Sequence, residues 1–250
     1  MSRRRLLRGG ATALVLAVAA YFFGRSLADN WTAVREIDVR FDVGSVGAVL
    51  LFGAAVVVSG LLWGHMVSGI GKTRVSWADA IRVQCASWLL KYVPGQVGSV
   101  ANKVLWAGQR GISRTIVVIT FVYENVFLLL GSIVPTGVIL LLSRAFTDAD
   151  DSMRGTFVPV LLALVPLMLV TNRRAFRWGV NLVARRALKR DTPVEYFLSS
   201  GEALAYQLAF LLPRVVNAVG FILILTGFPD VPSAAYVPLA AAYVLAGAVG

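Results

Sequence analysis

The chain has 250 residues, of which 58% are hydrophobic and only 15% are charged, and its mean hydropathy is +0.75. This composition excludes an ordinary soluble domain and predicts an all-α, polytopic membrane protein. The net charge of +11 does not indicate a nucleic-acid partner, because the basic residues are separated into short, alternate loops and do not form one basic face.

About six apolar runs approach the ~20 residues that an α-helix needs to cross a hydrocarbon core of ~30 Å. They lie near residues 10–27, 43–66, 115–142, 156–170, 203–227 and 233–250. We therefore predict a single transmembrane domain, residues 1–250, with about six spanning helices. The first run follows arginines as an export signal does, but it continues to membrane length at Phe23, which favours an uncleaved span. The last run has no polar cap, so we expect the chain to end within a transmembrane helix.

Basic residues are concentrated in alternate loops. They gather in residues 3–8, 72–82, 110–114 and 173–190, whereas residues 28–42 and 143–154 are acidic on balance. Cytoplasmic loops of membrane proteins carry an excess of Lys and Arg, so this alternation places the basic loops and the N-terminus in the cytoplasm. The pattern predicts a multi-pass protein of the cell membrane.

Residues 83–108 lie between two basic loops that are both expected on the cytoplasmic side. A re-entrant helical hairpin that turns at Pro94-Gly95 satisfies the charge rule, and a helix that crosses the membrane is the alternative. The stretch WLLKYVPGQVGSVANK (residues 88–103) also carries the polar residues Lys91, Gln96, Asn102 and Lys103. Backbone that breaks at membrane depth needs polar partners or trapped water, so this stretch is the first candidate for the working site.

Two further charges, Glu124 and Arg214, fall inside predicted spans. At 1.5 Å per residue they lie ~13 Å and ~16 Å from the cytoplasmic ends of those spans. A lone charge at this depth costs on the order of 3 kcal/mol and usually faces a partner or a water-filled cavity. One hypothesis is that the two residues pair, or that both line a cavity closed by the hairpin. The other is that Glu124 is protonated or bonded to Asn125, while Arg214 binds backbone groups freed by Pro213.

Residues 173–190 show a helical periodicity with two chemically different faces. One face carries Phe176, Val180, Val183 and Ala187, and the other carries Arg174, Arg177, Asn181, Arg185 and Lys189. This pattern predicts a helix that lies in the cytoplasmic membrane interface, where anionic headgroups attract basic residues. A solvated loop that only sets the topology is the alternative.

The sequence contains no nucleotide-binding loop, hydrolase elbow or catalytic Ser/His/Asp set. We therefore predict neither enzymatic activity nor a cofactor. Cys85 and His65 are the single cysteine and the single histidine, so no intramolecular disulfide and no metal site is expected.

The segment from Trp88 through Lys91-Tyr92-Val93-Pro94-Gly95-Gln96-Val97-Gly98 resembles the signature of the lysylphosphatidylglycerol synthase transmembrane region, also called the flippase-like domain family. Glu124 in the following span fits the same pattern, and the resemblance covers essentially the whole chain. Two features depart from it. Asn125 stands where a basic residue is common, and the chain ends before the family's second Pro/Gly-rich re-entrant element.

The resemblance implies a protein that binds and translocates anionic or glycosylated lipids, with membrane phospholipids or polyprenyl-linked lipids as partners. The expected headgroup cavity is lined by Lys91, Tyr92, Pro94, Gly95, Gln96, Gly98, Asn102, Lys103, Glu124 and Arg214. We find nothing in this sequence that corresponds to the aminoacyltransferase domain of some members, so we do not expect it to carry out aminoacyl transfer. A non-transporting subunit that presents lipid to a glycosyltransferase or synthase partner is a second hypothesis, and a proton-coupled transporter of small solutes is a third.

Overall fold

The computed structural model describes residues 24, 25, 28, 31, 43–90, 97–142, 169–188 and 192–249. All regular elements in these ranges are helices, which confirms the all-α prediction for this part of the chain. The predicted span near 156–170 falls almost wholly outside the described residues, as does the one near 10–27. The chain divides into two compact units, Met1–Arg40 and Phe41–Gly250, and the elements below belong to the second.

Three stretches in the described ranges are long and apolar enough to cross a membrane. They are Val43–Gly71, Arg114–Ile139 and Val194–Leu225. The elements that form them are α3 (Val43–Gly71), α6 (Arg114–Leu142), η3 (Val194–Tyr196), α10 (Ser200–Ala209) and α11 (Leu211–Leu225). These stretches match the predicted spans near 43–66, 115–142 and 203–227 and indicate a multi-pass membrane protein.

The predicted span near 233–250 is represented by a shorter apolar element. It comprises η4 (Ser233–Ala235) and α12 (Tyr236–Val249), and α12 has only 14 residues. Its inner side packs on α6 and α11, and the Thr136 hydroxyl donates a hydrogen bond to the Ala241 carbonyl oxygen at 3.1 Å. A full crossing by this segment stays a prediction.

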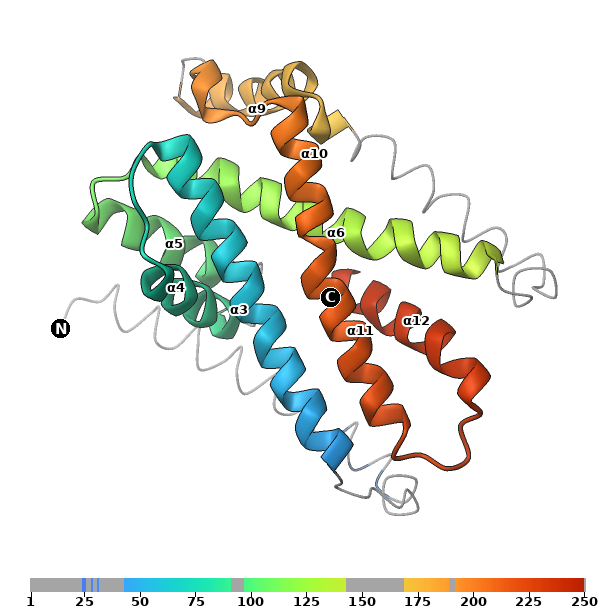
Figure 1. Ribbon diagram of the computed structural model, residues 1–250. Coiled ribbons are helices and arrows are strands. Elements are labelled where there is room, and N and C mark those ends of the chain that lie inside the picture. Colours follow the sequence, from blue (N-terminus) through green and yellow to red (C-terminus); the bar gives the residue numbers. More distant parts are fainter. Residues whose placement is uncertain are drawn as a thin grey trace. The chain divides into compact units, whose positions relative to one another are not determined.

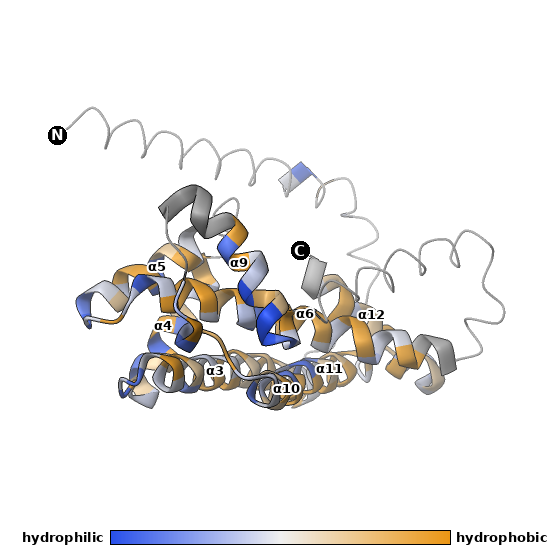
Figure 2. Cartoon of the chain, turned by 90° about the horizontal axis from the view of Figure 1, so that it is seen from above, coloured by the Kyte–Doolittle hydropathy of each residue, from blue (hydrophilic) through white to orange (hydrophobic). Residues whose placement is uncertain are grey.

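The helices α3 and α11 lie side by side and run antiparallel (Figure 1). Near one end, Gly47 faces Leu223, and near the other end Met66 and Phe210 belong to one buried cluster. Apolar residues dominate both helices, whereas hydrophilic residues are conspicuous on α9 (Figure 2). The helices α4, α6, α10 and α12 each pack against at least one member of this pair.

A local capping signal starts α10. The Ser199 hydroxyl accepts a hydrogen bond from the Glu202 backbone N–H, and the Glu202 carboxylate accepts one from the Ser199 backbone N–H. This reciprocal pair satisfies two helix-end donors that would otherwise lack partners. The helix therefore begins where the sequence places a Ser-x-x-Glu pattern.

The helices α4 (Trp77–Leu90) and α5 (Val97–Gln109) pack against each other as an antiparallel pair. They contain 14 and 13 residues, so each is ~20 Å long, which is less than the ~30 Å of a hydrocarbon core. Arg110 at the end of α5 bonds to Asp79 at the start of α4 at 2.9 Å, so both outer ends of the pair lie together. The predicted helical hairpin is therefore present, and its return to one side of a membrane stays a prediction.

The predicted helix of residues 173–190 is α9 (Arg173–Leu188), which follows the short η2 (Leu169–Thr171). The helix is confirmed, and its position in the membrane interface, as opposed to a solvated segment that only sets the topology, stays a prediction. Phe176 is buried in a cluster of aromatic rings that includes Tyr123 and Phe197, as the predicted apolar face requires. Asn181 was expected on the polar face, but it is buried. Its side-chain oxygen accepts a hydrogen bond from the Thr192 N–H, so the chain after α9 lies against it.

Candidate functional site

The centre of the site is an ion pair between Lys103 on α5 and Glu124 on α6. The Lys103 Nζ donates to Glu124 Oε2, and the two side chains are 1% and 4% exposed. Taking two charges out of water is costly, and their attraction compensates only when the geometry is good and the remaining atoms are also bonded. Because each of these two buried charges needs the other as its counter-ion, they are the strongest candidates for functional groups in this part of the chain.

The second carboxylate oxygen and the ammonium have further partners. Gln84 on α4 donates from Nε2 to Glu124 Oε1 at 2.7 Å. The Lys103 Nζ lies 4.4 Å from the ring centroid of Trp63 on α3 and 5.5 Å from that of Phe121 on α6. A cation over aromatic faces is stabilised by their quadrupoles, most when it is desolvated. Four helices thus contribute side chains to one charged cluster.

Two glycines allow α4 to approach α3 closely enough for Gln84 to reach the cluster. A Cβ at Gly60 would lie 2.8 Å from the Gln84 Cβ, and one at Gly64 would lie 2.5 Å from the Ala80 Cβ. Small residues four apart give two membrane helices a shared groove of this kind. The pattern Gly60-Leu-Leu-Trp-Gly64 therefore positions both Gln84 and Trp63.

Within the hairpin, Asn102 bonds α5 to α4. Its Nδ2 donates to the Ser87 hydroxyl at 2.9 Å and to the Val83 carbonyl oxygen at 3.2 Å. Gly98 is half-buried near the start of α5. Asn102 thus holds the two helices in register, and its amide nitrogen is already used for this purpose.

The outer end of the hairpin is more exposed to water. The Ser76 hydroxyl donates to the Asp79 carboxylate at 2.7 Å, and the Asp79 carboxylate also accepts from Arg110. The Ser76 hydrogen bond, together with the nearby Arg110 charge, holds the pKa of Asp79 below its usual range. Because Arg110 is half exposed, this pair fixes geometry more than it adds stability.

The predicted direct pair of Glu124 and Arg214 is wrong. Glu124 binds Lys103 and Gln84, whereas the Arg214 Nε donates to the Leu128 carbonyl oxygen on α6 at 3.1 Å. Arg214 also lies in a mostly apolar groove of about 140 Å³ between α6, α11 and α12. Arg214 therefore bonds to a backbone carbonyl, as the second hypothesis expected. That carbonyl belongs to the neighbouring helix α6, however, and is not one that Pro213 frees.

Asn125 does not bond to Glu124 either, because its Nδ2 donates to the Phe121 carbonyl oxygen at 2.8 Å within α6. Five of the predicted cavity residues lie outside the described residues: Lys91, Tyr92, Pro94, Gly95 and Gln96. The structure therefore brings Lys103 and Glu124 together, bonds Asn102 to α4 instead, and places Arg214 elsewhere. The headgroup-binding role of the predicted residues stays a prediction.

Gln84, Trp63 and Ser87 were not predicted as site residues. Of these three residues, Gln84 could have been predicted from the sequence, because a side-chain amide at membrane depth in the predicted hairpin needs a polar partner. Its Oε1 is buried, and it has no hydrogen-bond partner among the described residues, as is also true of the Trp63 indole nitrogen. The cluster therefore retains one acceptor, the Gln84 Oε1, and one donor, the Trp63 Nε1, that are not used by the described residues.

Comparison with models of protein families, with curated proteins and with solved structures found no match for this chain.

Proposed function

We propose that this chain is a multi-pass protein of the cell membrane that binds lipids with anionic or glycosylated headgroups and translocates them. The observation that carries the proposal is the hairpin of α4 and α5, whose helices are too short to cross a bilayer and whose α5 contributes Lys103 to a buried ion pair with Glu124 of α6. The resemblance to the flippase-like domain family supports the same function.

In this proposal the ion pair exchanges partners. The Lys103 ammonium is neutralised by Glu124 while the site is empty, and a lipid phosphate replaces the carboxylate as its partner during passage. Gln84 then stays with Glu124 and moderates the cost of leaving that carboxylate without its cation. We further propose that Lys91 and Gln96, which stand between α4 and α5 in the sequence, supply the groups that bind headgroup oxygens, while the acyl or prenyl chains remain in the surrounding lipid.

A reconstituted translocation assay tests this function. We expect liposomes that contain the purified chain to transfer labelled phosphatidylglycerol between leaflets faster than protein-free liposomes do. We expect Lys91→Gln to slow transfer, because in this proposal its charge neutralises the headgroup phosphate, whereas Arg74→Gln should leave the rate unchanged because water screens that exposed loop charge. Equal rates with and without protein would contradict translocation, and equal losses in both variants would mean that the charges serve topology only.

Two other functions predict different results. A buried carboxylate such as Glu124 suits a proton carrier, so solute uptake that depends on a proton gradient would favour the small-solute transporter. Co-purification with a glycosyltransferase, with no translocation by the chain alone, would favour a lipid-presenting subunit. Mass spectrometry of lipid retained by the purified protein identifies the headgroup in either case.

Membrane sidedness of the hairpin is a separate prediction. In a Cys85-free background, we expect cysteines at Ala78 and at Gln109 to react with an impermeant thiol reagent from the same side of sealed vesicles. Both residues are exposed and flank the Asp79–Arg110 contact, so the reagent can reach them without disturbing that pair. Labelling from opposite sides would remove the re-entrant model and the account of the site that depends on it.

A further inference from the structure

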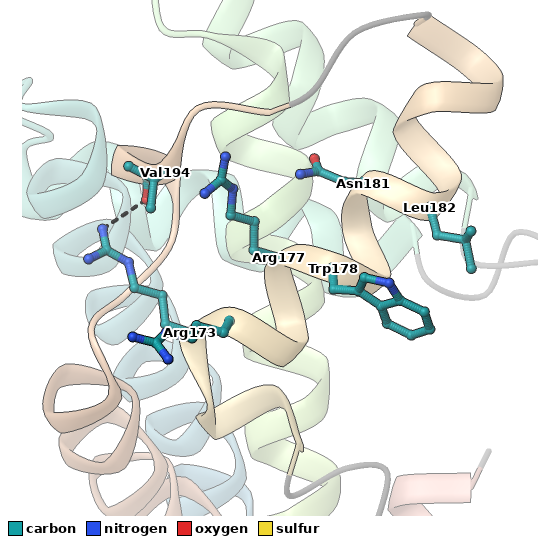
Figure 3. A pocket seen from close by; sticks show the side chains of 7 residues that line it. Arg173, Arg177, Trp178, Asn181, Leu182 and Val194 are labelled. Atoms are coloured by element: carbon teal, nitrogen blue, oxygen red, sulfur yellow. Dashed lines mark hydrogen bonds between the residues drawn. The ribbon is translucent and has the colours of Figure 1, made fainter.

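A second basic site lies on α9, remote in sequence from the buried ion pair. It is a groove of about 500 Å³ whose lining includes Arg173, Arg174, Arg177, Trp178, Leu182 and Val194. Figure 3 shows the Arg177 side chain between Val194 and Asn181, with Trp178 and Leu182 on the neighbouring part of the helix. Three guanidinium groups and two large apolar side chains therefore share one groove.

Several hydrogen bonds and buried side chains hold the helix that carries the groove. The Asn172 side-chain oxygen accepts hydrogen bonds from the Arg174 and Ala175 N–H groups, which caps the start of α9. Phe176 is buried in the aromatic core, and the buried Asn181 binds the Thr192 N–H. These contacts fix the orientation of the helix, so the arginines present a preorganised surface.

The three arginines differ in how much of their bonding capacity is used. The Arg173 Nη2 donates to the Val194 carbonyl oxygen at 2.8 Å, and its charge also acts on Glu202. Arg174 and Arg177 have no carboxylate partner among the described residues. The Nε atoms of Arg173 and Arg177 are buried without a hydrogen-bond partner in the same ranges. The free donors belong to guanidinium groups, which fit the oxygens of a phosphate.

Apolar exposure decides between a membrane lipid and a soluble anion. Trp178 is 71% exposed and Leu182 is 50% exposed, although both are large apolar side chains. A helix with Trp and Leu exposed beside arginines is typical of an element that lies in the headgroup region of a bilayer. Indole rings in particular prefer this interface.

We propose that this groove binds the phosphate of an anionic glycerophospholipid from the adjoining leaflet. Arg174 and Arg177 contact the phosphate oxygens, and Arg173 keeps the Val194 backbone in place as the opposite wall. Trp178 and Leu182 pack against the glycerol backbone and the first methylenes of the acyl chains. The site needs no translocation, so it stands independently of the function proposed above.

Native mass spectrometry of the purified chain in detergent tests the proposal. The titrants are phosphatidylglycerol, phosphatidylcholine with the same acyl chains, and sodium phosphate. We expect phosphatidylglycerol to bind most tightly and the double variant Arg174→Gln/Arg177→Gln to weaken it on the order of tenfold or more, since each basic residue near anionic lipid contributes ~1 kcal/mol. The matched control Lys72→Gln/Arg74→Gln removes the same charge from an exposed loop and should bind as the unmodified chain does.

Further variants keep the test decisive. Arg174 is exposed, so Arg174→Gln alone should fold normally and lose part of the affinity. Trp178→Ala/Leu182→Ala should weaken phosphatidylglycerol binding while the arginines remain. Equal binding of phosphatidylglycerol to the unmodified chain and to the arginine double variant would overturn the site. Sodium phosphate that binds as tightly as the lipid, or phosphatidylcholine that binds equally well, would overturn the assignment to an anionic lipid.

Discussion

Replacing Glu124 with glutamine is expected to lower the free energy of unfolding by about 3–5 kcal/mol, because Lys103 is then a buried cation without its anion. Lys103→Met should cost a similar amount, since it leaves the Glu124 carboxylate with only Gln84. Thermal or chemical unfolding of the purified protein in detergent measures both losses.

The double variant Lys103→Met/Glu124→Gln separates a true pair from two independent buried residues. Removing both charges also removes the desolvation cost, so its loss should be clearly smaller than the sum of the two single losses. Asp79→Asn is the matched control, because it breaks the half-exposed pair with Arg110 and should change stability little. Strictly additive losses for Lys103 and Glu124 would show that the two charges do not stabilise each other.

Gly64→Ala is the second substitution with a large expected effect. The added methyl group would lie 2.5 Å from the Ala80 Cβ, so α4 must move away from α3. Overpacking of this kind costs about 1–3 kcal/mol. The same movement should weaken the bond from Gln84 to Glu124, so the variant is expected to lose both stability and any activity that depends on the ion-pair cluster.

Gly53→Ala on the same helix is the control for this substitution. A Cβ at Gly53 meets no atom within 4 Å, and alanine is a better helix former than glycine by ~1 kcal/mol. This variant should therefore be as stable as the unmodified chain or slightly more so. Equal unfolding temperatures for the Gly64 and Gly53 variants would mean that the close approach of α3 and α4 is not needed.

The sequence by itself determined the features that depend on local pattern. The length of an apolar run predicted α3, α6 and the stretch that contains α11, because a helix satisfies its own backbone groups and needs only a sufficient apolar length. The periodicity of residues 173–190 predicted α9, and the basic loops on both sides of residues 83–108 predicted the hairpin. None of these inferences needs knowledge of which helices are neighbours.

The tertiary structure alone decided which polar groups meet. The sequence indicates only how deep a residue lies along its helix, and Glu124 and Arg214 lie at similar depths, so it allowed them to pair. The partner of each side chain depends also on how its helix is rotated and on which helices are its neighbours. The Gly60 and Gly64 contact brings α4 against α3, and the hairpin then carries Lys103 to Glu124. Asn181 shows that local periodicity is also insufficient to predict burial. The helical periodicity places Asn181 on the same face as the arginines, but the chain at Thr192 lies against its side chain. Which polar residues are buried and which of them pair depends on contacts between helices that are distant in sequence. The local periodicity of a segment does not predict those contacts.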